Sequence, residues 1–322
     1  MRKFALALAA LALASAASPA LAQSWPSRPV KLLVGFPAGG STDLAARLLA
    51  NRLSQALGQS VVVENKVGAS GNIASETVAH APADGYTLMM AATSMAAAPA
   101  FFDKLAWDPV KDFTPVALVA TVPIMLVATP QLNVRNVAEL VAYSKARPGQ
   151  VNMASPGPTT LVRLSGEQFK QTAKLDWLTV NYKGGAPAMQ DMLAGTAQVM
   201  FAQISDVIAQ VKAGKLVPIA VTTKARSAIV PEIPTLSESG YPGFGFATWQ
   251  GVVGPAGLPP EVVARLNREI RRILAEPETR TQFLAIGTDV ATGSPEEFGA
   301  LIAEEVDKIK RIAKSVGATA AN

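Results

Sequence analysis

Four short loops carry the side chains of this chain that are best suited to bind a ligand. The first spans residues 36–43, reads Phe-Pro-Ala-Gly-Gly-Ser-Thr-Asp, and lies between an apolar run and a segment of helical periodicity. Its adjacent glycines let the backbone turn sharply and present bare N–H groups. The N-terminus of the next helix adds unpaired donors and a partial positive charge, which suits an anion. Candidate binding residues are therefore Phe36, Gly40, Ser41 and Thr42, although a purely structural turn explains this loop equally well.

Asp43 lies in the first turn of that helix. An acidic side chain there is favourable for the helix, but it would repel an anion placed against it. We therefore expect Asp43 to hold the loop by hydrogen bonds without touching the ligand. The loop differs from a phosphate-binding loop, because no Gly-Lys-Ser/Thr sequence follows the glycines.

Two further polar segments follow in the same half of the chain. Residues 68–74 again come after an apolar run and open a helix, and Ala69 and Ser70 offer exposed amides and a hydroxyl. Thr93 and Ser94 end the next apolar run, so two adjacent hydroxyls would lie at the carboxyl end of a strand. Such positions suit hydrogen bonds to a ligand, although ordinary loop hydroxyls are the alternative.

The fourth loop repeats this arrangement farther along the chain. Residues 155–160 follow the apolar run at 151–154, and they supply Ser155, Gly157, Thr159 and Thr160 as candidates. Arg163 lies one turn into the helix that follows, and a guanidinium can bind a carboxylate through two parallel hydrogen bonds. A solvent-exposed arginine on a helix is the alternative.

Catalytic and metal-binding patterns are absent from the sequence. His80 is the single histidine and precedes a turn, so we expect it at the surface. The chain has no cysteine, no Gly-x-Ser-x-Gly segment and no cluster with metal-ligand spacing. Asp191 and Asp206 are isolated acids with no evident acid or base partner. We therefore expect no enzymatic activity, no cofactor and no metal.

The four loops are positioned by alternating strands and helices. Apolar runs at 30–34, 61–63 and 87–90 alternate with helical periodicity at 44–57 and through 73–78, which predicts a mostly parallel sheet covered by helices. The alternation resumes after residue 124, and long helices are expected at 261–275 and 296–316. Two such α/β lobes imply a cleft between them, where ligands bind beyond the carboxyl ends of the strands.

The N-terminus has the pattern of a secretory signal peptide. Arg2 and Lys3 precede the apolar stretch 4–17, and Ala20-Leu21-Ala22 forms a cleavage signature. We expect cleavage after Ala22 and export to the periplasm without a membrane anchor. The apolar segment 116–128 is too short to span a bilayer and contains Pro123, so it predicts one buried strand or two strand pieces joined at a bend.

The charge balance argues against binding to nucleic acid. The chain has 29 Lys and Arg against 24 Asp and Glu, and loss of Arg2 and Lys3 lowers the net charge to +3. This small, dispersed excess favours anionic solutes weakly. The densest basic group, Arg265 to Arg272, is interleaved with apolar residues at helical spacing and indicates a solvated helix face.

Seven short segments in order resemble one known family. They lie at residues 36–43, 68–73, 82–88, 107–115, 182–188, 233–240 and 249–255. Together they are similar to the periplasmic binding components of tripartite tricarboxylate transporters, the Bug receptor family. The resemblance covers essentially the whole chain after residue 22.

This resemblance implies a type II periplasmic-binding-protein fold, an α/β fold of two lobes joined by two hinge strands. It places the hinges near 116–128 and 247–255, the first lobe at 23–124 plus 249–322, and the second lobe at 125–248. In similar receptors the loops matching Ser41-Thr42 and Ala69-Ser70 hold one carboxylate of the ligand, partly through water. The position matching Asp206 directs a polar side chain into the cleft of some relatives, for example toward an amine or hydroxyl of the ligand.

Two departures from the family pattern bear on the ligand. Relatives often have a histidine within the segment matching 95–99, which is small and apolar here, and another where Arg163 stands. The first change makes the pocket wider or more apolar, and the second either adds a cation or is silent. We therefore favour a dicarboxylate, or a carboxylate with an apolar or aromatic body. A tricarboxylate is the alternative, although the sequence offers few cations to neutralise its charges.

The resemblance implies a receptor that delivers its solute to membrane permease subunits, and we expect it to be a monomer. Two alternatives remain. A loaded receptor that docks on a membrane sensor kinase would use the same binding step. A periplasmic hydrolase or lyase would need catalytic groups that the sequence does not offer.

Overall fold

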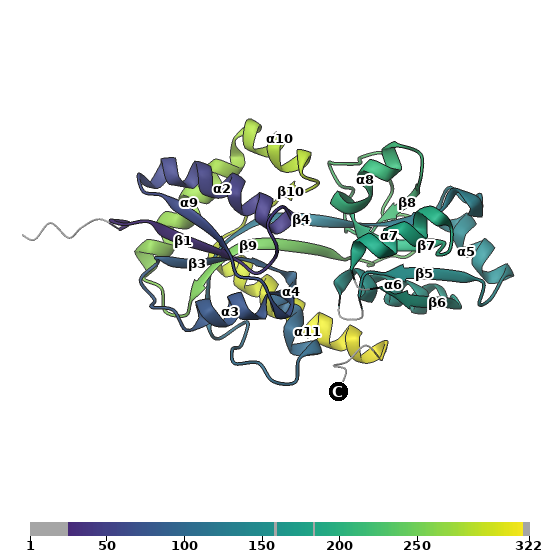
Figure 1. Ribbon diagram of the computed structural model, residues 1–322, viewed down its shortest axis with the longest axis horizontal. Coiled ribbons are helices and arrows are strands. Elements are labelled where there is room, and N and C mark those ends of the chain that lie inside the picture. The colour runs from purple at the N-terminus through teal and green to yellow at the C-terminus, as the bar shows by residue number, and fades with distance from the viewer. Residues whose placement is uncertain (1–24, 158–159, 183, 318–322) are drawn as a thin grey trace, which may run out of the picture.

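Two α/β lobes lie side by side and share long strands (Figure 1). The computed structural model describes residues 25–157, 160–182 and 184–317. The predicted signal peptide at 1–22 lies outside these residues. No helix within these described ranges is long and apolar enough to cross a membrane.

The first lobe is built on a largely parallel sheet. Strands β2 (Val61–Asn65), β1 (Val30–Val34) and β3 (Thr87–Ala92) are parallel neighbours. Strand β9 (Ala247–Pro255) pairs antiparallel with β3 and with β4 (Phe113–Ala128). The short β10 (Asp289–Val290) also pairs with β4. The segment 116–128 thus belongs to one continuous strand, and the alternative of two pieces is wrong.

The second lobe uses the far end of β4. Its residues 124–128 pair with β7 (Val199–Gln203), and 125–128 pair with β8 (Val217–Val221). Strand β5 (Val151–Ser155) lies parallel to β7 and to β6 (Trp177–Asn181). Strands β1, β2, β3 and β5 form within two residues of their expected bounds, and β4 begins three residues before the expected segment 116–128. Each lobe has the parallel core that the alternation indicated.

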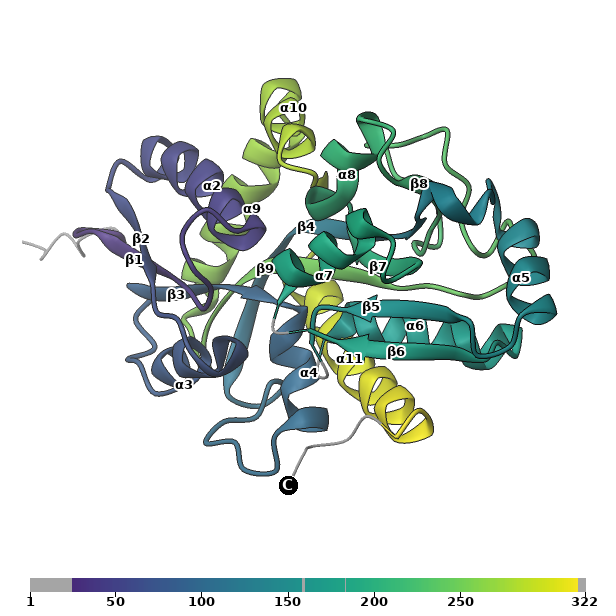
Figure 2. The same cartoon turned by 45° about the vertical axis from the view of Figure 1, so that its right-hand side comes forward.

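Helices cover both faces of the first sheet (Figure 2). Helices α2 (Ser41–Leu57), α9 (Pro260–Ala275) and α10 (Pro277–Ala285) lie on one side. On the other side lie α3 (Asn72–Ala79), α4 (Thr93–Phe101) and α11 (Pro295–Ser315). Helix α11 begins at a capping box in which Ser294 and Glu297 satisfy each other's backbone N–H groups.

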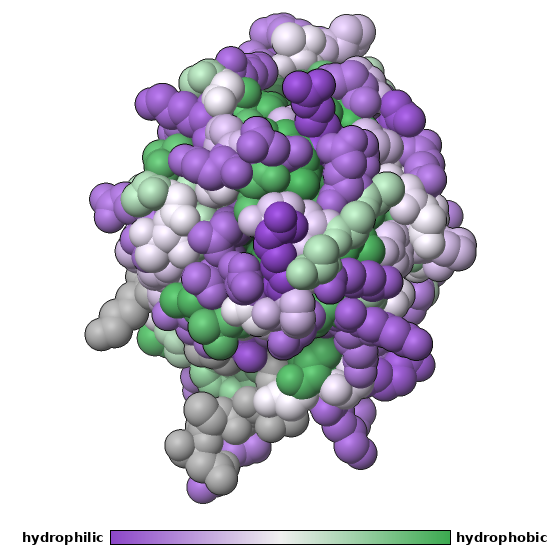
Figure 3. All heavy atoms as spheres, turned by 90° about the vertical axis from the view of Figure 1, so that its right-hand side faces the viewer, coloured by the Kyte–Doolittle hydropathy of each residue, from purple (hydrophilic) through white to green (hydrophobic). Residues whose placement is uncertain are grey.

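The second lobe has its own helices and its own apolar cluster. They are α5 (Val137–Ala146), α6 (Leu161–Ala173), α7 (Gly185–Ala194) and α8 (Ile204–Lys212). Single 3₁₀ turns occur at Ala69–Gly71 and Pro130–Leu132. Figure 3 shows that the outer end of this lobe is mostly hydrophilic, with hydrophobic side chains in small groups.

Sequence reasoning placed two segments wrongly or not at all. The alternative that Thr93 and Ser94 are ordinary loop hydroxyls is wrong, because they begin α4: the extended Ala92 ends the strand and small helix-forming residues follow. Helix α10 was not predicted. The lobe boundaries expected near 124 and 248 stay a prediction.

Candidate functional site

A cavity of about 410 Å³ lies where loops and helix N-termini of both halves of the chain meet. Eleven of its lining residues come from the segments 36–42, 70 and 92–98, and the others come from more distant elements. The lining includes Phe36, Gly40, Ser41, Thr42, Ser70, Thr93, Ser94, Thr160, Gln203, Asp206, Thr248, Trp249 and Gln250. A larger groove of about 1120 Å³ runs along α9. That groove lies away from the carboxyl ends of the strands, so the smaller cavity is the candidate site.

The N-terminus of α2 opens directly into this cavity. Gly40 is its N-cap in an extended conformation, and no side chain caps the helix. The first amides of α2 therefore have no side-chain acceptor, and the helix dipole places partial positive charge there. The Gln250 amide nitrogen lies 3.4 Å from both the Ser41 and Thr42 hydroxyl oxygens. This end of the cavity can bind an anion through donors alone.

Asp43 holds the loop before α2. Its Oδ2 accepts hydrogen bonds from the Gly39 N–H and the Arg47 Nε, both at 2.9 Å, and its Oδ1 accepts one from Asn65 Nδ2 at 2.8 Å. Burial disfavours the charged carboxylate, but these hydrogen bonds outweigh it and lower the pKa of Asp43. Asp43 does not line the cavity. The expectation that it holds the loop without facing the ligand agrees with this geometry.

The second loop is held in an uncommon backbone conformation. Ala69 and Ser70 have φ values of 46° and 58°, and Gly71 follows at 93°. Consecutive residues other than glycine in the left-handed region cost free energy, and such strain concentrates at functional sites. Ser70 lines the cavity, whereas Ala69 does not. A Cβ on Gly35 would lie 2.7 Å from Gly71 Cα, so the first and second loops are in close backbone contact.

Thr93 and Ser94 both line the cavity, but their hydroxyls differ in their capacity to form a hydrogen bond with a ligand. Thr93 is 2% exposed, and its Oγ1 accepts the Trp249 N–H at 2.6 Å and lies 3.4 Å from the Trp249 carbonyl. That hydroxyl ties α4 to β9. Ser94 is half-buried and is the better placed of the two to meet a ligand.

The fourth loop contributes less than the sequence suggested. Thr160 lines the cavity and caps α6 by accepting the Arg163 N–H. Ser155 and Gly157 do not line it; the buried Ser155 hydroxyl instead bonds to the Gly157 backbone and shapes the loop. Thr159 lies outside the described residues.

Arg163 also does not line the cavity. Its Nε lies 3.9 Å from Glu167 Oε1, one turn along α6, and its side chain is 16% exposed. Glu167 also pairs with Lys170 at 3.1 Å. A role for Arg163 as a cation for a second carboxylate stays a prediction.

Sequence reasoning missed a polar edge formed by Gln203, Thr248 and Gln250. Gln203 Nε2 donates to Thr248 Oγ1 at 3.3 Å, which joins the end of β7 to β9. It also missed Phe101, Phe102 and Leu161, which together with Ala97 and Ala98 give the cavity an apolar wall. The expectation that the segment at 95–99 makes the pocket wider or more apolar than in relatives stays a prediction.

Asp206 is the one charged residue among the described residues that line this cavity. It lies in the first turn of α8, and Ser205 Oγ is 3.4 Å from its Oδ1. Water reaches its side chain through the cavity, but the surrounding walls partly desolvate it and raise its pKa.

The described residues contain no group of three or more His, Cys, Asp or Glu that could hold a metal ion. His80 is exposed, as expected, and its Nδ1 lies 2.9 Å from the Glu76 carbonyl on the same helix.

Comparison with known proteins gives consistent results. Residues 45–318 match the model of the tripartite tricarboxylate transporter family receptor. The chain is 34% identical over 310 residues to Protein BugT of Bordetella pertussis, covering 96% of this chain and 95% of BugT. The structure of R. palustris Rpa4515 with adipate is 35% identical with a TM-score of 0.81, covering 92% of this chain and all of that one. MatC from Rhodopseudomonas palustris with bound malate is 33% identical with a TM-score of 0.74, covering 89% and 99%.

Proposed function

The chain belongs to the tripartite tricarboxylate transporter receptor family, and from this premise we propose that it captures a small carboxylate in the cavity at the N-terminus of α2. This family consists of periplasmic solute-binding receptors, not enzymes. The observation that carries the proposal is the meeting of the uncapped α2 N-terminus with Ser70 in one cavity. Both present donors to the same space, which is what a carboxylate requires.

Two relatives support the chemical class of the ligand. Rpa4515 was solved with adipate and MatC with malate, and both ligands are small carboxylates. The apolar wall of Phe101, Phe102 and Leu161 suits an apolar body attached to the carboxylate. Ligand-binding roles for Phe36, Gly40 and the Ser41, Thr42, Ser70, Ser94 and Thr160 hydroxyls are part of this proposal.

Delivery follows from closure of the two lobes. A solute that contacts both halves of the cavity binds the closed state more tightly and shifts the population toward it. The closed, loaded receptor then docks on membrane permease subunits after export and removal of residues 1–22. Our proposal includes the lobe boundaries near 124 and 248, so that the two lobes would turn about β4 and β9.

The test is thermal unfolding of the mature protein, refolded from denaturant to strip any bound solute, against mono-, di- and tricarboxylates and aromatic acids. A ligand at a hundredfold excess over Kd stabilises the native state by about 2.7 kcal/mol, which gives a readable rise in Tm. Ser70→Ala should weaken binding of the tightest-binding acid roughly tenfold, because the substitution removes a hydrogen bond to the charged carboxylate. Ser60→Ala, at an exposed serine outside the cavity, is the control. If no acid raises Tm, carboxylate capture is wrong.

A further inference from the structure

A groove along α9 combines an apolar floor with a row of basic side chains. This α9 groove of about 1120 Å³ lies over the start of β4, with α9 on one side and the first turns of α11 on the other. Its apolar lining includes Pro109, Val110, Pro115, Leu258, Val263 and Ile302. Within the described part of the chain it shares no lining residue with the cavity at the α2 N-terminus. A partner bound in the groove therefore leaves that cavity open to a solute.

The basic side chains of the groove outnumber its acidic ones. They are Arg268, Arg271, Arg272 and Arg280, and Glu296 is the one acidic residue among the described residues that line it. All four arginines are exposed. Like charges on the wall of a concave surface reinforce one another's potential and attract an anionic partner. The solvated helix face expected from the sequence is thus also the wall of a groove.

These arginines differ in whether an acid of the protein already holds them. Arg268 and Arg272 each have their Nε 3.1 Å from a carboxylate oxygen of Glu269. Arg271 and Arg280 form no ion pair with any described residue. A guanidinium in that state can bind a carboxylate of a partner through two parallel hydrogen bonds. The groove therefore offers two separate positions for carboxylates.

The apolar floor extends to the surface at Val110. This side chain is 49% exposed and lies in the loop before β4. Apolar side chains of a partner that cover it are removed from water together with it, which stabilises the complex. Addition of a strand to this edge of β4 is disfavoured, because Pro115 has no N–H and the Val116 carbonyl already accepts a 2.8 Å hydrogen bond from Asn267 Nδ2. The partner must bind through its side chains.

We propose that the α9 groove binds an acidic polypeptide segment of a protein partner. Carboxylates of that segment pair with Arg271 and Arg280, and its apolar side chains cover Val110 and the floor. A polypeptide segment fits a concave surface, whereas a flat anionic lipid surface would reach the arginines at the rim and leave the apolar floor uncovered. The inference is independent of carboxylate capture, because the two sites are lined by different residues.

The first experiment measures the fluorescence anisotropy of short labelled peptides made of Glu and Leu, one with helical and one with alternating spacing. Comparison peptides replace every Leu by Ser, or every Glu by Lys. We expect one Glu-Leu peptide to bind at least about tenfold more tightly than both of its comparison peptides. The double variant Arg271→Gln and Arg280→Gln should weaken this binding at least about tenfold. The matched control, Arg135→Gln with Lys145→Gln, removes two exposed cations of the second lobe outside the groove and should leave it unchanged.

The apolar floor is tested by Val110→Glu, which places a negative charge where the partner's apolar side chains would lie. It should weaken the Glu-Leu peptide at least about tenfold. Val62→Glu is the matched control, because Val62 is 50% exposed on β2 and lies outside the groove. It should bind the peptide as the native protein does.

Several results would overturn the inference. They are no binding of either Glu-Leu peptide, equal binding of the Glu-Ser peptide, or equal affinity after loss of Arg271 and Arg280. Binding to vesicles of phosphatidylglycerol and phosphatidylethanolamine that persists in Val110→Glu but not in the arginine variant would assign the surface to a membrane instead. A dimer in sedimentation that the arginine variant abolishes would assign it to a second copy of the chain. Carboxylate affinity should be the same in the arginine variant and the native protein, so failure of either proposal leaves the other standing.

Discussion

Ser227 Oγ donates a 2.7 Å hydrogen bond to Asp289 Oδ2. Asp289 pairs with Thr121 through β10, and Ser227 lies in the segment between β8 and β9. Nearby, a Cβ on Gly287 would lie 2.8 Å from Ser205 Cα, so the chain before β10 packs closely against the start of α8. These contacts join β10 of the first lobe to the start of α8 and to the segment that follows β8, both in the second lobe.

Asp289 gives this junction a dependence on pH. Burial raises its pKa above the ordinary 3.8, although hydrogen bonds from Ser227 and the Ala228 N–H act in the opposite direction. A carboxyl whose folded pKa is raised contributes its stability below the unfolded pKa and loses it as pH rises through the folded value. Asp289→Asn keeps an acceptor for Ser227 and removes the charge. We expect its Tm to exceed that of the native protein at about pH 8 and the difference to vanish toward about pH 4.

The measurement is Tm against pH for both proteins. Ser227→Ala is the companion variant and should lower the stability at neutral pH by about 1 kcal/mol, because it removes a donor to the charged carboxylate. A difference between Asp289→Asn and the native protein that is constant across pH would contradict this account.

Asp43 should show the opposite dependence on pH. Its pKa is lowered because three hydrogen bonds outweigh the cost of burial, so its contribution is present above 3.8 and is lost as pH falls through the folded pKa. Asp43→Ala should cost about 2–3 kcal/mol of unfolding free energy at neutral pH, since it leaves the Gly39 and Asn65 donors without their acceptor. It should also weaken ligand binding, because Gly39 precedes the N-cap of α2.

Denaturant unfolding at neutral and acidic pH, together with ligand titration, tests this prediction. Arg47→Ala is the control: Arg47 is half exposed, so loss of its ion pair should cost no more than about 1 kcal/mol. If the two substitutions lower the free energy of unfolding equally, Asp43 stabilises the protein through its ion pair with Arg47 and not through its hydrogen bonds to the loop.

The local elements of this fold could be predicted from the sequence because their signals are local. Gly58 adopts the left-handed conformation that ends α2, and Asn136 and Thr160 cap α5 and α6. The loops that open α2 and α3 were found for the same reason, since each glycine-rich turn lies directly between a strand and a helix. Asp206 was reached only through the family resemblance.

The polar edge of the cavity could not be predicted, because it depends on pairing between distant segments. Thr248 and Gln250 reach the site because β9 inserts between β3 and β4, although both of these strands come much earlier in the chain. The Thr93–Trp249 hydrogen bonds span 156 residues. The residues of β9 do not specify which neighbours the strand pairs with.

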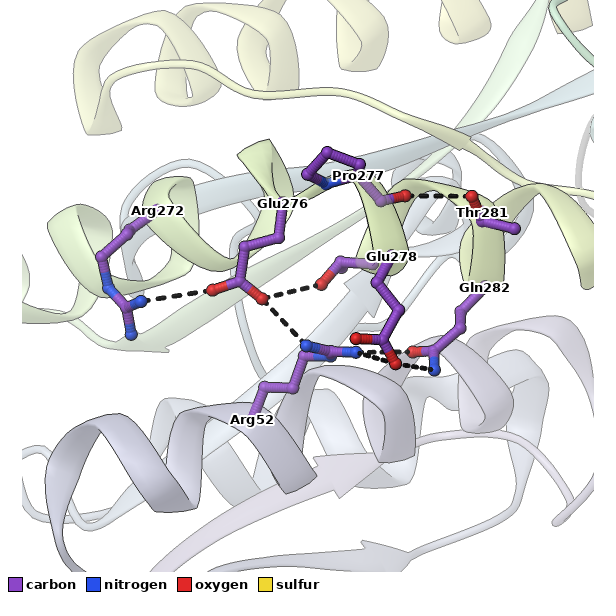
Figure 4. A network of polar contacts seen from close by, with 8 residues as sticks. Arg52, Arg272, Glu276, Pro277, Glu278, Thr281 and Gln282 are labelled. Atoms are coloured by element: carbon purple, nitrogen blue, oxygen red, sulfur yellow. Dashed lines mark hydrogen bonds and ion pairs between the residues drawn. The ribbon is translucent and has the colours of Figure 1, made fainter.

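Arg52 fixes α2, whose N-terminus forms the site, against α10 (Figure 4). Its guanidinium reaches Glu276 at 2.9 Å, Glu278 at 3.0 Å and Gln282 at 3.3 Å, and its side chain is 20% exposed. Arg52→Lys keeps the charge but cannot form this fork, and we expect a loss of about 1–2 kcal/mol in the free energy of unfolding. Lys31→Ala, which breaks the exposed pair with Glu64, should cost less than about 1 kcal/mol. If the two variants unfold at the same denaturant midpoint, the network adds nothing beyond a surface ion pair.

Gly35 sets the spacing between the two loops that we propose bind the first carboxylate. A Cβ at this position would lie 2.7 Å from Gly71 Cα and 3.3 Å from the Gly71 carbonyl oxygen, both backbone atoms that cannot rotate away. Gly35→Ala should therefore push the loops at 36–41 and 68–71 apart. We expect a loss of about 1–3 kcal/mol in stability from overpacking and about tenfold weaker ligand binding.

Gly185→Ala is the matched control, because a Cβ there meets no atom of the described residues within 4 Å. It should alter neither Tm nor affinity. Titration of both variants with the best acid, after circular dichroism shows that they are folded, separates a local from a global effect. If Gly35→Ala lowers Tm yet binds the acid as tightly as the native protein does, the spacing of these two loops does not control the site. The first carboxylate would then be held by the α2 N-terminus alone, where Gln250 already contacts Ser41 and Thr42.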